Sequence, residues 1–287
     1  MTVAVVSPGA MGSALGAALA RGGERVVATV AGRSERTARL AEQAGLELVP
    51  DLRSAIGDAD VVLSVVPPAA APVVATDVVR ASEPSTSPLL VDLNAIAPAT
   101  ALGIASKAAD GGVDVVDGSI SGPPPWRPGT TRIYLSGARA REIASLPFDG
   151  VDLIVVGDEV GAASAVKMST ASVYKGTSAL LAQALVAARA NGVLEYVVSD
   201  LRAGAPELVA NVERRLASAA AKSARYVGEM EEIASAQTAA GLTPSLFEAM
   251  ADVYTAMART QLATKNPDEL PPDLALENVL EQLVERP

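Results

Sequence analysis

Short apolar segments alternate with helical segments over residues 1–156, and this alternation restricts the possible folds more than any other feature of the sequence. The apolar runs at residues 60–66 and 89–93 are continuous, as in parallel strands that helices cover on both faces. Helical segments are expected between the strands, at residues 36–44, 69–80 and 97–109. Such an alternation predicts a doubly wound α/β sheet. From residue 157 to residue 287, glycine, proline and strand patterns become rare, so we expect an all-α C-terminal domain there.

A glycine turn follows the first apolar run. Residues 3–6 lead into Ser7-Pro8-Gly9-Ala10-Met11-Gly12, and a helix rich in alanine and leucine continues to residue 20. The turn matches the G-x-G-x-x-G fingerprint of dinucleotide-binding folds, with Ser7 in place of the first glycine. Gly9 would let the backbone approach a pyrophosphate, and Gly12 would let the helix pack on the strand. The alternative is a tight turn in an ordinary α/β protein. We predict an N-terminal Rossmann-like domain over residues 1–156, with cofactor contacts from Ser7, Gly9, Ala10, Met11 and Gly12.

The second strand, at residues 25–31, ends at the segment that selects the cofactor in such folds. An acidic residue here binds a ribose 2′-hydroxyl, whereas an arginine accommodates a 2′-phosphate. This chain has Arg33, Ser34 and Arg36, which predict NADP(H) rather than NAD(H). Ser34 could instead cap the next helix, with both arginines solvated. That alternative explains Ser34 but not two arginines in a chain of net charge −10.

The carboxyl ends of the later strands carry further candidate contacts, because ligands of open α/β sheets bind there. We predict that Val66, Pro67 and Asn94 contact the cofactor. A strand near residues 113–117 leads to Ser121-Gly122, whose hydroxyl and backbone N–H groups could bind a substrate carboxylate. Three prolines and Trp126, the only tryptophan, follow this loop. Strands at residues 131–136 and 151–156 are expected to complete the sheet.

A long helix is predicted over residues 156–190, where small and straight-chain residues continue without proline. Asp158 and Glu159 are expected at its start, where the helix dipole favours carboxylates. Polar side chains recur at positions i, i+3, i+7 and i+11 and so share one face. These residues are Lys167, Thr170, Tyr174 and Ser178. The alternative to a functional face is a solvent-facing stripe with an extended lysine.

The composition limits the chemistry. The chain has no cysteine and no histidine, which excludes thiolate nucleophiles and argues against serine–histidine triads and metal sites. Proton transfer must therefore use Lys, Tyr, Asp or Glu. The net charge of −10 argues against nucleic acid as a partner. Residues 1–20 contain no basic segment, Pro8-Gly9 interrupts them, and no apolar run has the length of a membrane span. We expect a cytoplasmic protein that does not enter a membrane.

The order of these motifs resembles that of the β-hydroxyacid dehydrogenase superfamily, which includes 6-phosphogluconate dehydrogenase, 3-hydroxyisobutyrate dehydrogenase and the imine reductases. Residues 7–12 are similar to its glycine turn, residues 117–122 to its D-x-x-x-S-G substrate loop and residues 161–167 to its G-x-x-x-x-x-K helix. The segment from Lys222 resembles a phosphogluconate-dehydrogenase-like branch. The resemblance implies that Lys167 is the catalytic acid/base. We expect Tyr174, seven residues further along the same face, to orient the substrate or to be the proton donor itself. We also expect Ser121, Gly122 and Thr170 to bind the substrate, and Trp126 with the neighbouring prolines to form an apolar wall beside it.

The sequence departs from the family pattern at three positions. Ala171 replaces an asparagine, Pro123 replaces the second glycine of the substrate loop, and Tyr174 replaces the acidic residue of the phosphogluconate dehydrogenases. These changes argue against sugar-acid decarboxylation. The expected reaction is hydride transfer between NADP(H) and a carbonyl or hydroxyl carbon of a small, possibly carboxylate-bearing substrate lying between the domains. One alternative is an imine reductase with Tyr174 or Lys167 as proton donor. Another is a non-catalytic NADP(H)-binding protein.

The C-terminal helices are rich in Ala, Leu and Val, and the resemblance implies a homodimer that buries them. Lys222, Arg225 and Glu229 are spaced i, i+3 and i+7, as on one face of a helix. A surface ladder of salt bridges is the favoured interpretation of these three residues, and a contact with the active site is the other.

Overall fold

The computed structural model describes residues 1–82 and 87–284, and the chain divides into two compact units, Met1–Met168 and Ser169–Pro287. The sequence analysis places the domain boundary between residues 156 and 157. The structural division instead falls within a long helix, α7 (Ala162–Ala190), whose first turns belong to the first unit. The last three residues of the expected second domain lie outside the described residues.

The first unit is an α/β domain. Its strands are β1 (Thr2–Val6), β2 (Arg25–Thr29), β3 (Glu47–Val49), β4 (Val61–Ser64), β5 (Leu89–Asp92), β6 (Val115–Ser121), β7 (Thr131–Ser136) and β8 (Val151–Gly157). Its helices, besides the start of α7, are α1 (Ala10–Arg21), α2 (Glu35–Gln43), α3 (Leu52–Gly57), η1 (Pro68–Ala70), α4 (Ala71–Ala81), α5 (Pro98–Asp110) and α6 (Ala140–Ala144).

The strands form one sheet in the order β3-β2-β1-β4-β5-β6-β7-β8. Every neighbouring pair is parallel except β6 and β7, which are antiparallel. The first six strands follow the order of a dinucleotide-binding fold, so the predicted Rossmann-like sheet is confirmed. All four residues of β4 and of β5 are buried, which explains their uninterrupted apolar sequences. The edge strand β8 instead alternates half-buried and exposed residues.

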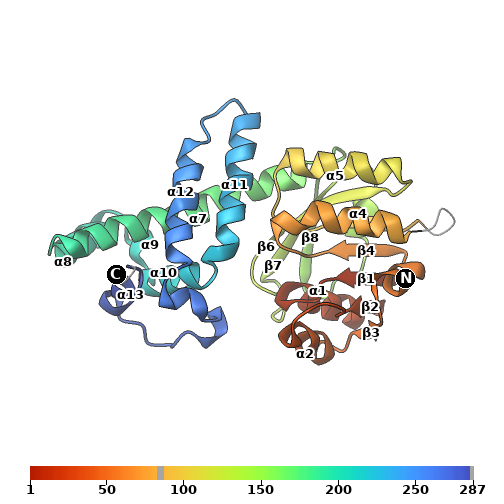
Figure 1. Ribbon diagram of the computed structural model, residues 1–287, viewed down its shortest axis with the longest axis horizontal. Helices are drawn as coiled ribbons and strands as arrows, with labels where there is room; N and C mark the ends of the chain where they lie inside the picture. The colour runs from red at the N-terminus through yellow and green to blue at the C-terminus, as the bar shows by residue number, and fades with distance from the viewer. Residues whose placement is uncertain (83–86, 285–287) are drawn as a thin grey trace. The chain divides into compact units, whose positions relative to one another are not determined.

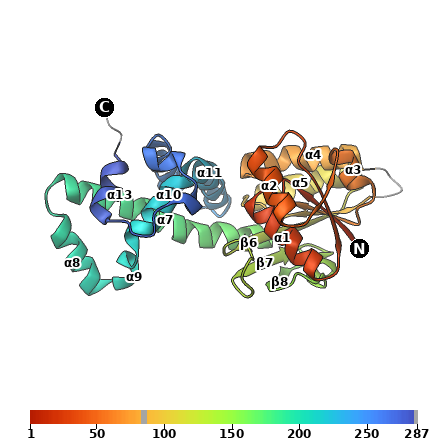
Figure 2. The same cartoon turned by 90° about the horizontal axis from the view of Figure 1, so that it is seen from below.

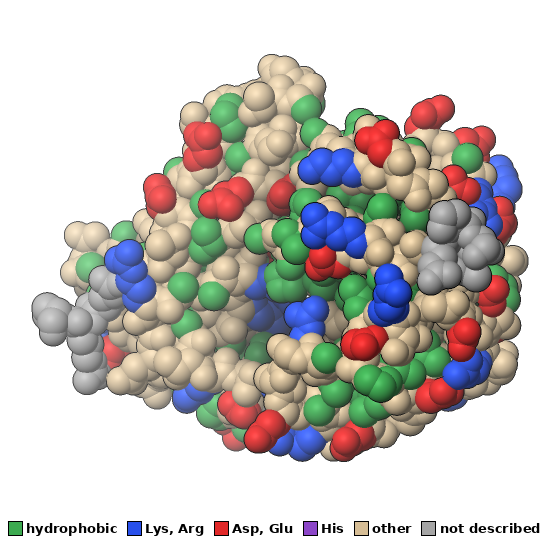
Figure 3. All heavy atoms as spheres, turned by 45° about the vertical axis from the view of Figure 1, so that its right-hand side comes forward, with side chains coloured by type: hydrophobic (Ala, Val, Ile, Leu, Met, Phe, Trp, Pro, Cys, Tyr) green, Lys and Arg blue, Asp and Glu red, His purple; other side chains and the backbone are tan. Residues whose placement is uncertain are grey.

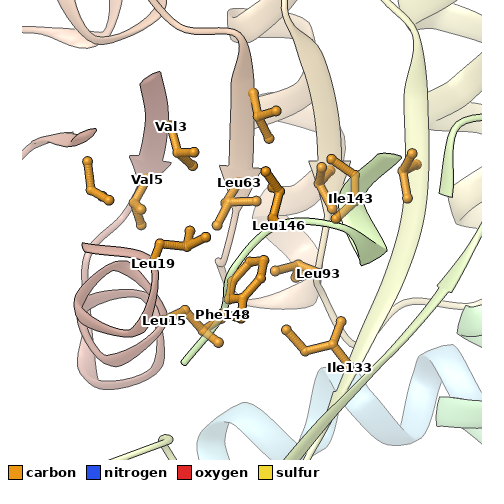
Figure 4. Close-up of a cluster of buried hydrophobic side chains, with 14 of the residues drawn as sticks. Val3, Val5, Leu15, Leu19, Leu63, Leu93, Ile133, Ile143, Leu146 and Phe148 are labelled. Carbon is orange, nitrogen blue, oxygen red and sulfur yellow. The ribbon is translucent and has the colours of Figure 1, made fainter. Parts of the chain in front are cut away.

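Helices cover both faces of the sheet (Figure 1), and each face has its own apolar core. Residues of α3, α4 and α5 pack on one face, among them Ile56, Val78 and Ile104. The other face is covered by α1, α2 and α6. Figure 4 shows Leu15 and Leu19 of α1 beside Leu146 and Phe148, which follow α6. Burying these side chains stabilises the layered arrangement and fixes the loops at the carboxyl edge of the sheet.

The structure adds elements that the sequence pattern does not reveal. The short β3, α3 and α6 contain three to six residues each, too few for a periodic signal. Two of the expected strands are shorter than predicted, since β2 ends at Thr29 and β4 spans only Val61–Ser64. The helices α2, α4 and α5 begin and end within two residues of their predicted limits.

Residues 169–284 of the second unit form helices joined by turns and loops, with no strand among them, as predicted. After α7 the unit contains α8 (Leu194–Gly204), α9 (Pro206–Val209), α10 (Val212–Ala221), α11 (Ser223–Ala239), α12 (Ser245–Met257), η2 (Gln261–Thr264), η3 (Pro267–Glu269) and α13 (Leu276–Gln282). Helices α11 and α12 lie side by side (Figure 1), and α10 lies against α13 (Figure 2). The largest fully buried side chain of the chain, Tyr254 of α12, belongs to this unit.

Candidate active site

The glycine turn has the geometry of a dinucleotide-binding turn even though it begins with a serine. Ser7 adopts a φ of +65°, the left-handed conformation for which glycine is the usual residue. Its carbonyl accepts a 2.7 Å hydrogen bond from the Gly9 N–H, which closes the turn between β1 and α1. No acidic residue lies in the first turn of α1. The N-terminal N–H groups of this helix therefore form a region suited to an anion.

The two glycines of the turn have different surroundings. A Cβ on Gly12 would lie 2.8 Å from the carbonyl oxygen of Ser7, so a larger residue would push α1 away from β1. A Cβ on Gly9 would meet nothing within 4 Å. Gly12 is thus required by the packing of the chain itself, whereas the space beside Gly9 is open. A ligand that approaches the backbone closely would need that space.

The residues after β2 lie at the surface. Ser34 is the N-cap of α2, and its hydroxyl oxygen accepts a 3.3 Å hydrogen bond from the Thr37 N–H. Ser34 therefore caps α2, as the alternative interpretation of this residue predicts. Arg33 and Arg36 are exposed, and no acidic side chain occupies the position of Arg33, directly after Gly32. The segment thus presents cationic side chains at the place where NAD-specific folds carry a carboxylate.

Asn94 connects the carboxyl ends of β4 and β5. Its amide oxygen accepts a 2.6 Å hydrogen bond from the Val66 N–H, and its amide nitrogen donates to Ser64 Oγ and Asp92 Oδ2, both at 2.9 Å. Asn94 is 3% exposed. Its side chain therefore holds the backbone at Val66 in place, and the adjoining Pro67 is exposed. The predicted cofactor contacts of Val66, Pro67 and Asn94 stay predictions.

Asp117 of β6 caps the N-terminus of α7. This carboxylate is completely buried and accepts hydrogen bonds from the Gly161 N–H at 2.9 Å, the Ser164 N–H at 3.0 Å and the Ser164 hydroxyl at 2.6 Å. The Ser136 hydroxyl of β7 donates a fourth bond at 3.0 Å. A buried anion at a helix N-terminus satisfies backbone donors and complements the helix dipole. The arrangement fixes the start of α7 on the sheet.

The predicted start of the long helix is therefore wrong. Strand β8 continues to Gly157, and α7 begins at Ala162, so Asp158 and Glu159 precede the helix. Neither lies in its first turn. The carboxylate that the helix dipole favours is supplied by Asp117, from another element of the sheet. The sequence pattern of a single segment could not reveal this, because the partners are 44 and 47 residues apart.

Lys167 lies in the second turn of α7 and is directed to the end of β6. Its ammonium donates a 2.7 Å hydrogen bond to the Ile120 carbonyl, and the side chain is partly buried. The Ser119 hydroxyl also ties β6 to α7, by a 2.8 Å bond to the Ala163 carbonyl. The Lys167 ammonium is thus bonded to Ile120, the residue directly before Ser121-Gly122. The structure brings together the lysine and the loop that the sequence analysis assigns to the substrate.

The Ser121-Gly122 loop has a conformation that depends on glycine. Gly122 has a φ of +119°, and a Cβ there would lie 2.3 Å from the Thr130 carbonyl oxygen. Pro123, the residue after Gly122, is held by the Thr131 hydroxyl, which donates a 2.5 Å hydrogen bond to the Pro123 carbonyl. Trp126 is 52% exposed. Of the three prolines before it, Pro123 is exposed, Pro124 half-buried and Pro125 buried, and the expected contact of Trp126 with the substrate stays a prediction.

Thr170 and Tyr174 follow on α7 in the second unit. Thr170 is partly buried and Tyr174 is 72% exposed. Ser178, the last residue of the predicted polar face, is buried and donates to the Tyr174 carbonyl at 3.1 Å. The face is therefore polar along its length but not uniformly exposed. The roles of Lys167, Thr170 and Tyr174 stay predictions.

The favoured surface ladder of Lys222, Arg225 and Glu229 is only partly confirmed, because Arg225 and Glu229 pair on α11 but Glu229 is buried and Lys222 bonds elsewhere. Lys222 lies between α10 and α11 and donates to Ser218 Oγ at 3.0 Å. Glu229 is 4% exposed and forms ion pairs with Lys175 of α7 and with Arg225, the latter at 3.1 Å. A buried partner on another helix changes a surface ladder into an internal ion cluster. The spacing within one helix does not indicate that partner.

Three further findings concern metal ions, membrane spans and surface charge. Within residues 1–82 and 87–284, no group of three acidic side chains could hold a metal ion. Over the same residues, no helix is long and apolar enough to cross a membrane. On the face shown in Figure 3, acidic and basic side chains are interspersed and do not form one continuous basic patch.

Comparison with known proteins gives two family matches. A family described as "NADP oxidoreductase coenzyme F420-dependent" matches residues 2–95, and a domain of unknown function, DUF1932, matches residues 188–257. An uncharacterized 28.5 kDa protein of Methanothermus fervidus is 27% identical over 172 residues. That match covers 60% of this chain and 65% of the relative, so it extends over just under two thirds of the relative's length.

Several solved structures share the fold. A conserved protein of unknown function, described as structurally similar to 3-hydroxyacid dehydrogenases, is 28% identical, with a TM-score of 0.66 over 90% of this chain and 98% of that one. Mycobacterium tuberculosis 3-hydroxyisobutyrate dehydrogenase, solved with L-serine, is 22% identical, with a TM-score of 0.69 over 98% of both chains. An imine reductase from Myxococcus stipitatus, solved with NADP⁺, is 19% identical, with a TM-score of 0.56 over 93% and 97%.

The chain shares its fold with these 3-hydroxyisobutyrate dehydrogenase and imine reductase structures. The oxidoreductase family model matches residues 2–95, which lie within the first unit. The resemblance to 3-hydroxyacid dehydrogenases and imine reductases that the motifs indicate is therefore confirmed.

Proposed function

We propose that this chain is an NADP(H)-dependent oxidoreductase. It transfers a hydride between the nicotinamide and a carbonyl or hydroxyl carbon of a small substrate that can carry a carboxylate, with Lys167 as general acid/base. The observation that carries the proposal is the position of Lys167. Its ammonium lies 2.7 Å from the Ile120 carbonyl, one residue before Ser121-Gly122, in the unit that also carries the glycine turn.

The residues present fit a dinucleotide. The open space at Gly9 and the N-terminal N–H groups of α1 suit a pyrophosphate, and Ala10 and Met11 supply two of those groups. Arg33 and Arg36 are exposed after β2 and suit a 2′-phosphate, with Ser34 at the start of α2. When bound, the nicotinamide supplies or accepts the hydride. The chain itself supplies position and the proton.

Lys167 is suited to proton transfer because its ammonium has three N–H donors. One of them is donated to the Ile120 carbonyl, and this bond orients the ammonium beside the Ser121-Gly122 loop. In the direction of reduction, Lys167 gives a proton to the oxygen that becomes a hydroxyl, and in oxidation it takes that proton back. The Ser121 hydroxyl and the Gly122 N–H would bind the substrate beside it, and Thr170 would add a hydroxyl from α7.

The proposal is tested by following NADPH absorbance with purified protein and a panel of oxo acids, aldehydes, ketones and cyclic imines. Turnover of one carbonyl class supports a dehydrogenase. Turnover of imines alone would favour the imine reductase alternative. NADPH binding without turnover of any member would favour the non-catalytic alternative.

The imine reductase alternative is favoured by one observation, the 72% exposure of Tyr174. A phenol that is open to solvent on α7 could donate a proton to a substrate nitrogen. Replacing Tyr174 by phenylalanine separates the two possibilities in the same assay. A large loss of turnover in Tyr174→Phe, with Lys167→Met still active, would make Tyr174 the donor.

The glycine turn provides a paired prediction. Gly9→Ala is expected to leave the thermal midpoint nearly unchanged and to weaken NADPH binding at least tenfold, because a methyl group would occupy space that only the cofactor needs. Gly12→Ala is expected to lower the free energy of unfolding by about 2 kcal/mol, because of the clash with the Ser7 carbonyl. Circular dichroism and calorimetric titration measure the two effects. Unchanged NADPH affinity in Gly9→Ala would contradict a cofactor at this turn.

The preference for NADP(H) gives a second prediction. Arg33→Gln is expected to weaken NADPH binding about tenfold and to leave NADH binding unchanged, because one charge-assisted bond to the 2′-phosphate is lost. Arg39→Gln is the matched control, since Arg39 is an exposed arginine of α2 paired with Glu35 at 3.7 Å. Equal losses for NADPH and NADH in Arg33→Gln would remove the basis for NADP specificity.

We further propose a homodimer that forms through the helical unit. Large apolar side chains of this unit are exposed on α7 and α8, including Val173 at 63%, Leu180 at 62% and Tyr196 at 77%. A second copy could cover such residues. A cytoplasmic location remains a prediction from the sequence.

A further inference from the structure

The helical unit contains a cavity of its own, which none of the roles proposed above for the α/β unit uses. Its volume is about 520 Å³, within the range that accommodates a small organic ligand. Residues of α7, α9, α10 and α11 line it. The lining combines two tyrosine rings, Tyr174 and Tyr226, and the side chain of Leu208 with the cationic groups of Lys175 and Arg215.

The position of Lys175 is fixed by a buried cluster. Its ammonium forms an ion pair with Glu229, and the two side chains are only 13% and 5% exposed. The same ammonium lies 4.7 Å from the centre of the Tyr226 ring. Tyr226 in turn packs edge-on against Tyr254, whose hydroxyl donates a 2.7 Å bond to the Lys175 carbonyl. Burial raises the pKa of Tyr226, so its hydroxyl stays protonated at neutral pH.

Such a cluster has little value for stability alone. A buried ion pair seldom contributes more than an apolar replacement would, because both charges lose their hydration. Its presence beside a cavity therefore points to a function for the charge that faces the cavity. Lys175 lines that cavity, whereas Glu229 supports it from α11.

The charges around the cavity favour an anion. The lining carries two cationic side chains, Lys175 and Arg215, and one carboxylate, Glu207. Outside the lining, Lys222 donates to the lining residue Ser218, and Glu229 pairs with Lys175 and Arg225. Arg215 is fixed by bonds to the backbone carbonyls of Leu208 at 3.1 Å and Glu207 at 3.3 Å. A local excess of positive charge in a chain of net charge −10 attracts an acidic ligand.

We propose that this cavity binds a small organic carboxylate with an apolar body. The carboxylate lies at Lys175 and Arg215, and the apolar part lies against the rings of Tyr174 and Tyr226 and the side chain of Leu208. The site belongs to the helical unit alone. It shares Tyr174 with the imine reductase alternative, but its occupation requires neither NADPH nor Lys167, so this proposal and the proposed oxidoreductase activity can fail separately.

Calorimetric titration of the full chain with phenylacetate tests this inference. Phenylacetate is expected to bind, 2-phenylethanol to bind at least tenfold more weakly and 2-phenylethylamine to give no heat, because only the first carries the carboxylate. Saturating NADPH is expected to leave phenylacetate binding unchanged. No binding of phenylacetate, or its displacement by NADPH, would overturn the proposal.

Two variants locate the ligand. Arg215→Gln is expected to weaken phenylacetate binding at least tenfold. Arg214 is an exposed neighbour on α10 outside the cavity lining, and Arg214→Gln is expected to change the binding less than twofold.

Because Arg215 also holds α9, a second variant is needed. Leu208→Trp fills the cavity without removing a charge and is expected to abolish binding with an unchanged circular dichroism spectrum. Binding that survives Leu208→Trp would overturn the proposal. Light scattering gives a further check. If the wild-type protein is a dimer that binds no phenylacetate and Leu208→Trp is a monomer, a second copy of the chain occupies the cavity, and the proposal is overturned.

Discussion

Replacing Lys167 by methionine is expected to lower turnover by about a hundredfold or more and to leave NADPH affinity unchanged. Methionine keeps the length and apolar stem of lysine but cannot carry a proton. The hydrogen bond to the Ile120 carbonyl is also lost. Because that bond involves a partly buried side chain, the free energy of unfolding is expected to fall by only about 1 kcal/mol. Steady-state kinetics on the substrate class found by the panel, together with NADPH titration, measures these effects.

Lys107→Met is the matched control for this experiment. Lys107 is an exposed lysine of α5 in the same unit and is none of the residues assigned to the cofactor or the substrate. It should keep wild-type kinetics. Unchanged turnover in Lys167→Met would sink the assignment of Lys167 as the acid/base. Equal losses in both variants would show that the effect is not specific to the site.

Replacing Asp117 by asparagine is expected to lower the free energy of unfolding by about 3 kcal/mol. The carboxylate accepts four hydrogen bonds in a fully buried position, from Gly161, Ser136 and Ser164. An asparagine of the same shape loses the charge and turns its NH₂ group toward at least one of these donors. The start of α7 then has unsatisfied N–H groups in the interior. Urea unfolding followed by circular dichroism measures the change.

Asp152→Asn serves as the comparison for Asp117→Asn. Asp152 of β8 is 59% exposed and lies 3.8 Å from Arg132, so its replacement should cost less than about 1 kcal/mol. Because Asp117 fixes the helix that carries Lys167, Asp117→Asn should also lower turnover. A stability equal to that of the wild type would contradict the capping role that the geometry assigns to Asp117.

Much of the fold can be predicted from local patterns, because parallel strands that are buried on both faces need continuous apolar sequence. The strands at β4 and β5 are recognisable for this reason. Elements that depend on tertiary packing cannot be recognised in this way. The three-residue β3 pairs with β2 at the edge of the sheet, and only this pairing makes it a strand. The five-residue α6 is held by Ile143 in the core under β8.

The residues of the candidate site likewise include some whose roles local sequence predicts and others whose roles it does not. Glycine positions such as Gly12 and Gly122 can be predicted, because close backbone approach and positive φ leave few other residues possible. The functions of Asp117 and Glu229 could not be predicted, since their partners come from distant segments. Asp117 belongs to a recognisable motif, yet its role in capping α7 becomes visible only when β6 and α7 are adjacent. Glu229 likewise needs Lys175 from another helix.

Calorimetric titration of the full chain with NADPH and with NADH, repeated on Gly9→Ala, shows whether the first unit binds NADP(H) at the glycine turn. NADPH is expected to bind at one site per chain, at least tenfold more tightly than NADH, and Gly9→Ala is expected to lose most of this affinity while remaining folded. If neither nucleotide binds to the folded wild-type protein, this chain is not an NADP(H)-dependent oxidoreductase.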